Sequence, residues 1–398
     1  MSLVSLPDEA DVVVVGGGIM GTSTAFFLTR RTERDVVLIE RDEIASGSSG
    51  DSSAIVRHHY GPQRIYSELA KWSHDFYRSF EAETGERIAY APNPMIRLGP
   101  TDSDAEDYAR AGYDVLESLD LPASWYEGDE LDEQYPMLAL DDVDFAVSDD
   151  DSGYSDGTDV AGGFARAAQQ QGATVVTGVA VEDVAVEDDA VTAVRTTDGT
   201  VETDDVVLAA GPWTPRIAET VGLDVPIVPT REQVVVLDPP STYVDEYPDL
   251  LPSAGAPGGD WYIRPDFGDG ILVATHHTGE EVDPDHYDER PDRETVLELS
   301  ERLQSFVPEL DDARVRGQYC GVYSTTPDHD FIVDQAGPEG CYIGCGFSGH
   351  GFKHAPGVGR MLADLVVDGD TDVVDVEFFS YDRFEDDPAG HGRPDDKI

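Results

Sequence analysis

The first forty residues combine two continuous apolar runs with one helical pattern. Residues 11–15 form an apolar run that ends in glycines, and residues 36–39 form a second run that ends at Glu40. Between them, residues 19–30 place apolar side chains at helical spacing. Continuous apolar runs are typical of parallel strands that are buried on both faces. The pattern therefore predicts a βαβ unit at the start of the chain.

The same reasoning predicts elements along the rest of the chain. Residues 225–237 and 261–276 alternate between apolar and polar positions, which is typical of strands in a sheet that covers a cavity. The last dozen residues are expected to be disordered. The other expected helices are 65–82, 102–119, 162–172, 291–307 and 354–367, and the other expected strands are 173–181, 190–196, 201–209 and 340–345.

These elements fall into segments that alternate along the chain. We expect an α/β (α+β) protein in which a Rossmann-like nucleotide-binding domain is interleaved with a smaller substrate domain on a mostly antiparallel sheet. The nucleotide-binding domain is expected from residues 1–88, 152–222 and 318–398, the last of these including a C-terminal tail. The substrate domain is expected from residues 89–151 and 223–317. Such interleaving is typical of two-domain flavoenzymes.

The charge of the chain is strongly negative. It has 82 acidic and 26 basic residues, a formal net charge of −56, and only three lysines, Lys71, Lys353 and Lys397. The acids are spread over the whole length, as in proteins from a salt-saturated cytoplasm, where salt screens the repulsion. A polyanion such as nucleic acid would be repelled, so no nucleic-acid partner is expected.

The cysteines and the apolar segments indicate a cytoplasmic location. The three cysteines form no C-x-x-C pair, which favours a reducing compartment. We see no signal peptide, and no apolar segment is long enough for a membrane span. No metal is expected, because the adjacent histidines at 58–59 and 276–277 would face opposite ways on a strand.

A glycine motif joins the first strand to the first helix. Gly16, Gly18 and Gly21 form G-x-G-x-x-G, with Ile19 and Met20 between the last two. Such glycines make the tight turn, admit a pyrophosphate to the backbone and let the helix pack on the strand. Glu40, nineteen residues after Gly21, is placed to accept ribose hydroxyls and disfavours NADP. The alternative is a glycine turn that only closes a sheet.

Two further loops favour FAD over NAD. Residues 45–51 are small and polar, and Ser48, Ser49 and Gly50 could contact a pyrophosphate. Residues 344–353 lead into a helix whose N-terminal dipole could face the flavin pyrimidine edge. The residues expected there are Gly346, Ser348, Gly349, His350, Gly351 and Lys353.

Several stretches resemble the D-amino-acid-oxidase superfamily, within it the sarcosine oxidase and dimethylglycine dehydrogenase branch. They are the N-terminal unit and A-S-G-S-S-G-D-S-S-A-I-V-R-H-H-Y (45–60), V-V-L-A-A-G-P-W (206–213), W-Y-I-R-P-D (261–266) and G-F-S-G-H-G-F-K (346–353). The resemblance implies FAD and oxidation of the C–N bond of a small amino acid, such as sarcosine, dimethylglycine or proline, with hydride transfer to flavin N5.

The resemblance also implies roles for individual residues. Arg57 and Lys353 match the pair that holds the substrate carboxylate, and two cations that converge on one carboxylate give strong, oriented bonds. The alternative for Arg57 is a structural ion pair. His276, Tyr262 and Tyr323 match positions around the substrate amine, although such residues are often only part of a core. The remaining cofactor contacts that we expect are Arg41, Val181, Ala210, Gly211 and Trp213.

Two positions depart from monomeric sarcosine oxidases. Gly321 stands where those enzymes attach flavin through a cysteine, and Cys320 lies one residue earlier, so we expect noncovalent FAD. Leu272 stands where they have a lysine that promotes reaction with oxygen, so we expect another electron acceptor or a partner subunit, or else a slow oxidase. The alternatives are a D-amino-acid, glycine or 2-hydroxy-acid oxidoreductase, and a flavoprotein assembly factor without turnover.

Overall fold

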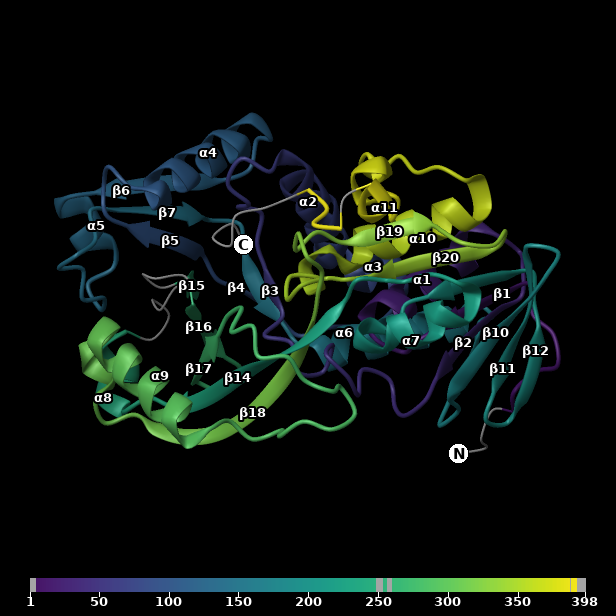
Figure 1. Ribbon diagram of the computed structural model, residues 1–398. Helices are drawn as coiled ribbons and strands as arrows, with labels where there is room; N and C mark the ends of the chain where they lie inside the picture. The colour runs from purple at the N-terminus through teal and green to yellow at the C-terminus, as the bar shows by residue number, and fades with distance from the viewer. Residues whose placement is uncertain (1–4, 248–252, 256–259, 387, 392–398) are drawn as a thin grey trace.

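The computed structural model describes residues 5–247, 253–255, 260–386 and 388–391. Two large sheets lie side by side, each in its own half of the molecule (Figure 1). The chain passes between the two sheets repeatedly, so each sheet collects strands from distant parts of the sequence. This mixed arrangement confirms the expected α/β class.

The first sheet has six strands in the order β19-β20-β13-β1-β2-β9. All neighbouring strands are parallel except β19 and β20. Strand β1 lies near the middle, so the glycine turn that follows it opens at the carboxyl edge of the sheet. The strands are β1 (Val12–Val15), β2 (Val36–Glu40), β9 (Thr174–Thr177), β13 (Asp205–Leu208), β19 (Ile332–Gln335) and β20 (Cys341–Cys345).

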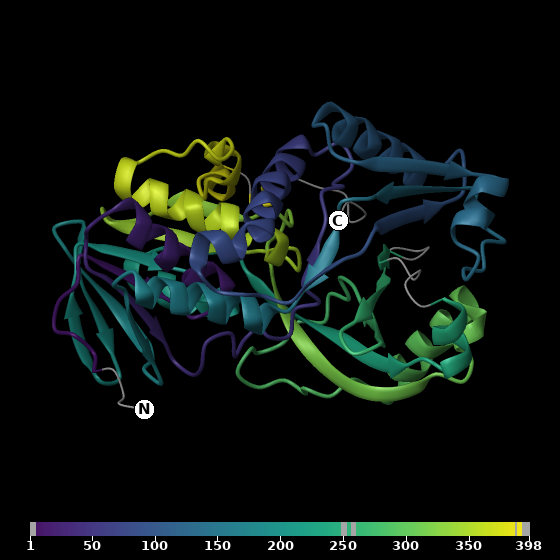
Figure 2. The same cartoon turned by 180° about the vertical axis from the view of Figure 1, so that it is seen from behind.

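The strands of this sheet are continuous apolar runs because other elements pack on both faces of the sheet. Val12 and Val14 pack in one core with the helices α1 (Ile19–Arg31), α6 (Gly157–Gln170) and α10 (Ala355–Asp368). Val13 and Val15 pack in a second core with an antiparallel three-stranded sheet. Figure 2 shows the helices and this small sheet on opposite sides. The small sheet consists of β10 (Val181–Glu187), β11 (Ala190–Thr196) and β12 (Gly199–Glu202).

The second large sheet has eight strands in the order β18-β14-β17-β16-β15-β5-β7-β6. All neighbours are antiparallel except β5 and β15. Helix α9 (Arg293–Phe306) packs on one face, and the other face looks toward the first sheet. The strands are β5 (Met95–Gly99), β6 (Ala123–Glu127), β7 (Phe145–Asp149), β14 (Val228–Asp238), β15 (Ser253–Gly255), β16 (Trp261–Asp266), β17 (Gly270–Thr275) and β18 (Arg314–Thr325).

Smaller elements complete the fold. A three-stranded sheet in the order β3-β8-β4 is formed by β3 (Ile55–Val56), β8 (Gly153–Ser155) and β4 (Tyr90–Pro92). In the described part of the chain, no helix combines the length and apolarity that a membrane span requires. The other helices are α2 (Arg64–Arg78), α3 (Phe80–Thr84), α4 (Asp104–Ser118), α5 (Asp129–Gln134), α7 (Thr214–Ala218), α8 (Ser241–Glu246) and α11 (Arg383–Asp386).

Some expected elements differ in the structure. The helix expected over 65–82 is two helices, α2 and α3, which meet at Ser79. The strand expected over 201–209 is divided between β12 and β13, which belong to different sheets. The sequence pattern missed β18, whose first half is largely exposed, and this strand runs through the expected boundary at residue 318. The expectation of disorder falls largely on 387 and 392–398, outside the described residues.

Candidate functional site

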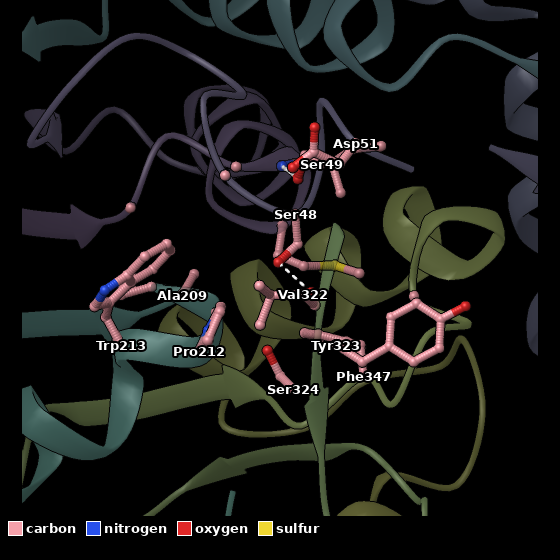
Figure 3. Close-up of a pocket in the computed structure, with 18 of the residues that line it drawn as sticks. Ser48, Ser49, Asp51, Ala209, Pro212, Trp213, Val322, Tyr323, Ser324 and Phe347 are labelled. Atoms are coloured by element: carbon pink, nitrogen blue, oxygen red, sulfur yellow. Dashed lines mark hydrogen bonds between the residues drawn. The ribbon is translucent and has the colours of Figure 1, made fainter. Parts of the chain in front are cut away.

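A cavity of about 360 Å³ lies at the carboxyl edge of the six-stranded sheet, where it meets the eight-stranded sheet. Figure 3 shows the serine loop (residues 45–51) on one side of it and Val322, Tyr323 and Ser324 of β18 on the other. Ligands of α/β sheets bind at this edge because the glycine turns open there. The cavity is lined by residues from the segments 15–20, 39–41, 46–53, 180–182, 209–217, 321–324 and 344–352, together with Glu232, Val234 and Tyr262.

The glycine turn has no room for side chains. Gly16 has a φ of +110°, and a Cβ there would lie 2.5 Å from the carbonyl oxygen of Ala209. A Cβ on Gly21 would lie 1.9 Å from the carbonyl oxygen of Gly16. Gly18 precedes helix α1 and offers no capping side chain, so the first turn of the helix presents backbone N–H groups at the glycine turn, of which Ile19 N is bonded to Ser49 Oγ. Such a turn is suited to binding a pyrophosphate.

Glu40 is fixed at the end of β2 by two backbone donors. One carboxylate oxygen accepts a hydrogen bond from Gly17 N at 2.6 Å, and the other accepts one from Asp42 N at 2.8 Å. A carboxylate oxygen can accept more than one hydrogen bond, so Glu40 can still accept ribose hydroxyls. These contacts hold the carboxylate at the cavity wall.

The serine loop lines the cavity between the start of helix α1 and strand β18. Ser49 Oγ accepts a hydrogen bond from Ile19 N at 2.9 Å, and Ser48 Oγ donates one to the carbonyl of Val322 at 2.6 Å (Figure 3). The loop thus joins helix α1 to strand β18. Glycine turn, carboxylate and serine loop together fit the pyrophosphate and ribose of a dinucleotide.

Most of the residues expected to bind the cofactor meet at this cavity. Gly21, Gly50, Gly346, His350 and Lys353 do not line it. Gly21 packs behind the turn, and the His350 ring is buried, with Nε2 3.1 Å from the carbonyl oxygen of His329. The expected residues that do line it are Gly16, Gly18, Ile19, Met20, Glu40, Arg41, Ser48, Ser49, Val181, Ala210, Gly211, Trp213, Ser348, Gly349 and Gly351.

Asp285 gathers three side chains at the rim of the cavity, and the sequence analysis missed it. It accepts hydrogen bonds from Arg41 and Trp213, each at 2.8 Å, and pairs with Arg216. The Arg41 guanidinium also stacks 4.0 Å from the Trp213 ring centroid. Arg41 and Trp213 are thereby held against the cavity. Asp285 carries no local signal because it lies in a loop of an acid-rich chain.

Arg57 and Lys353 do not line this cavity, and both are buried, 5% and 6% exposed respectively. The Arg57 guanidinium lies 4.1 Å from the Tyr60 ring centroid and donates to the carbonyl of His59. Within the described ranges, neither cation has a carboxylate within 4.0 Å. Burial, Arg57 and Arg97 together hold the pKa of Lys353 well below its ordinary value. Both basic side chains are therefore available to an anionic ligand, and the alternative of a structural ion pair for Arg57 finds no partner among the described residues.

His276, Tyr262 and Tyr323 come together from three strands or strand ends. His276 Nδ1 lies 3.4 Å from the Tyr323 hydroxyl, and the rings of His276 and Tyr262 are 5.8 Å apart in an edge-on arrangement. Burial, His277 and the nearby cations hold the pKa of His276 well below its ordinary value, so its ring is neutral at pH 7. Burial raises the pKa of both tyrosines. The group offers neutral hydrogen-bonding partners beside two cations.

Glu232 is a cavity-lining carboxylate that the sequence analysis also missed. It is 2% exposed and accepts hydrogen bonds from Thr275 Oγ1 at 2.8 Å and Thr278 N at 3.1 Å. Burial raises the pKa of Glu232 to about 7. An alternating strand pattern cannot show that an acid faces inward. Which face of the strand becomes buried is decided by its pairing within the sheet and by what packs on that sheet.

Glu232 makes the stability of the protein depend on pH. Its pKa is about 7 in the folded chain against 4.5 as the ordinary value, so its contribution is fully present below pH 4.5 and is lost as the pH rises through 7. Between pH 5.5 and 8.5 this loss amounts to about 2 kcal/mol of unfolding free energy. Glu232→Gln should remove it, whereas the exposed Glu187→Gln should not. Denaturant unfolding at both pH values measures the difference. The same change in unfolding free energy between the two pH values in wild type and Glu232→Gln would contradict this prediction.

Cys320 faces away from the cavity. Gly321 lines the cavity, where a Cβ would lie 3.2 Å from Asp51 Cβ, whereas Cys320 is buried and hydrogen-bonded to Arg231. Burial raises the pKa of the Cys320 thiol to about 11, which disfavours the reactive thiolate.

We therefore predict noncovalent attachment of FAD. Acid precipitation should release the yellow colour into the supernatant. Colour retained in the pellet, and lost from it in a Cys320→Ser variant, would show a covalent link instead.

The geometry of the cavity is that of a dinucleotide-binding protein, and comparison with known proteins agrees with this class. Residues 11–365 match the family described as FAD dependent oxidoreductase, and the chain belongs to this family. FAD is its cofactor, and the residues that line the cavity fit it.

Two curated relatives and one solved structure are especially similar. Monomeric sarcosine oxidase from Bacillus sp. (strain B-0618) is 29% identical over 94% of this chain and 96% of its own. Dimethylglycine dehydrogenase from Rattus norvegicus is 26% identical over 97% of this chain, which spans 45% of that longer protein. The crystal structure of L-proline dehydrogenase from P. horikoshii superposes with a TM-score of 0.86 at 27% identity, covering 96% of this chain and 99% of its own.

Proposed function

We propose that this enzyme oxidises the C–N bond of a small amino acid, specifically an N-methyl or secondary amino acid of the sarcosine, dimethylglycine or proline type. One observation carries the proposal: Arg57 and Lys353 are buried cations without a described carboxylate partner, next to a neutral histidine and two tyrosines. A small carboxylate supplies the missing charge. The names of the relatives, which include sarcosine oxidase and L-proline dehydrogenase, support the same substrate class.

In this proposal the carboxylate of the substrate binds between Arg57 and Lys353. Its arrival restores the charged form of Lys353, because an opposite charge favours protonation of a buried amine. Two cations that meet one carboxylate also fix the direction of the rest of the molecule. The amine end then lies toward His276, Tyr262 and Tyr323, where a neutral imidazole can take up a proton.

FAD, when bound, supplies the acceptor for the hydride equivalent that leaves the carbon beside the nitrogen. The residues of the chain contribute position and protonation state. Glu40, the glycine turn and the serine loop hold the nucleotide half of the cofactor, and the buried strands below the cavity keep water away from the reacting atoms.

An electron acceptor other than oxygen is part of the proposal. Leu272 is 1% exposed and packs with Val234 and Tyr262, so the face of the sheet toward the cavity is apolar at this position. A neutral side chain cannot stabilise the negative charge that develops on oxygen. The reduced enzyme should therefore react slowly with air.

Anaerobic mixing of the holoenzyme with a panel of amino acids tests the proposal. The panel contains N-methyl, cyclic, D- and unsubstituted amino acids together with 2-hydroxy acids, in molar salt. Bleaching of the flavin by N-methyl or cyclic members supports the proposal, and bleaching by hydroxy acids alone, or by none, would overturn it. Admitting air afterwards measures the reoxidation of the flavin. A return of the yellow colour at oxidase rates would contradict the proposal of an electron acceptor other than oxygen.

A further inference from the structure

Arg97 on β5 lies on the same face of the eight-stranded sheet as Tyr262. Gly255 on β15 is the register partner of both residues. Cross-strand partners project to the same face of a sheet, so the side chains of Arg97 and Tyr262 share one face. Two strand spacings separate their backbones, about 10 Å, which is within reach of an arginine side chain. Tyr262 lines the cavity and Arg97 does not, but the charge of Arg97 acts on His276 and Lys353, so its side chain lies near these two residues.

The Arg97 guanidinium has no anionic partner in the part of the chain that the structure describes. Its Nε is buried without a hydrogen-bond partner, and its guanidinium carbon lies 6.0 Å from the Tyr108 ring centroid. Burial and the charge of Arg57 lower the pKa of Arg97 to about 10. Arg57 and Lys353, both buried, and the half-buried Arg97 therefore form a group of three basic side chains that disfavour one another's charge.

The neighbouring arginine on this face, unlike Arg97, has a carboxylate partner. Arg264, two residues after Tyr262, pairs with Asp266 at 2.9 Å. The chain has 82 acidic residues against 26 basic ones, so carboxylates are plentiful. An uncompensated charge away from water is costly, and neither Arg57 nor Arg97 has a carboxylate beside it among the described residues. A ligand is the remaining source of the missing negative charge.

We propose that Arg97 binds a second anionic group of the substrate, so that the preferred substrate is an N-alkyl or cyclic amino acid with two carboxylates. This inference rests on the function proposed above. Arg57 and Lys353 hold the carboxylate next to the reacting C–N bond. Arg97 then holds the second carboxylate, to which its planar guanidinium can donate two parallel hydrogen bonds.

A matched pair of substrates isolates the second charge. N-methyl-L-glutamate and N-methyl-L-glutamine differ only in whether the side chain ends in a carboxylate or a neutral amide. Wild-type holoenzyme should show a kcat/KM about 50-fold higher for the glutamate compound. Arg97→Gln should remove this preference, chiefly by lowering the value for the glutamate compound. Arg110→Gln, on the exposed face of α4, is the control and should keep the preference.

Binding of unreactive acids provides a second measurement that does not need turnover. Glutarate and butyrate are titrated at constant ionic strength while the flavin spectrum is recorded. Wild type should bind glutarate at least tenfold more tightly, and Arg97→Gln should bind both alike. If Arg97→Gln does not fold, Arg97→Lys keeps a charge but loses the paired hydrogen bonds, and it should reduce the preference without abolishing it.

Failure of this inference differs from failure of the proposed function. Equal kcat/KM for the two N-methyl compounds, equal binding of the two acids, or a larger effect of Arg97→Gln on the neutral substrate would overturn the role of Arg97. In those cases N-methyl amino acids still reduce the flavin. Absence of flavin reduction by every amino acid, with normal FAD content, would overturn the proposed function instead.

Discussion

Lys353→Met should lower kcat/KM for the amino-acid substrate about a thousand-fold while FAD stays bound. The substrate carboxylate would lose one of its two cations in a buried place, where truncating one member of a charge pair costs about 4 kcal/mol. Methionine has a similar length and fills the same space without a charge. Lys353 is buried, Arg57 and Arg97 already disfavour its charge, and it makes no ion pair among the described residues, so the substrate-free variant should unfold at no lower denaturant concentration than wild type.

Anaerobic flavin reduction at several substrate concentrations measures kcat/KM, so that an effect on the substrate can be separated from an effect on FAD binding. FAD content is measured from the absorbance of the purified variant. Lys71→Met is the matched control, since Lys71 donates to the carbonyl of Leu119 at 2.5 Å, away from the cavity. An unchanged kcat/KM in Lys353→Met would show that the substrate carboxylate does not bind at Lys353. A loss of FAD would show instead that Lys353 belongs to the cofactor site.

Gly21→Ala should weaken FAD binding about a hundred-fold, the equivalent of ~3 kcal/mol of overpacking. The added Cβ would lie 1.9 Å from the carbonyl oxygen of Gly16, an atom of the turn itself. Helix α1 would have to move away from the turn, and its N-terminal N–H groups would leave their place beside the pyrophosphate. The protein should therefore purify with little flavin.

Titration of the apoprotein with FAD, followed by quenching of flavin fluorescence, measures this loss. Gly317→Ala is the matched control because a Cβ there meets nothing within 4 Å and its backbone suits any residue. It should bind FAD as wild type does. A Gly21→Ala protein with normal affinity would mean that the turn can shift without disturbing the nucleotide.

The sequence allowed the first half of the site to be predicted in detail. The glycine turn, Glu40 and the strand–helix–strand unit lie within thirty residues, where backbone geometry and apolar spacing decide the structure locally. The serine loop was also predictable, because small polar residues directly follow the second strand. Strand β18 was missed, since its first half is exposed and shows no buried face.

Other features depended on how strands pair. Glu232 and Arg97 stand in sequences that read as ordinary strands, and Asp285 stands in an ordinary acidic loop. Only the register that sets Glu232 opposite Gly321, and Gly255 between Arg97 and Tyr262, places these side chains at the site.

The sequence by itself determined the βαβ unit, the nucleotide turn and, through the resemblance of 346–353, the family. Each of these depends on local spacing, which survives in a linear chain. Only the tertiary structure decided that three cations meet without a carboxylate beside them, and that Cys320 turns away from the cavity. Those outcomes depend on burial and on partners far away in sequence, because a charge or a thiol acquires its chemistry from what surrounds it after folding.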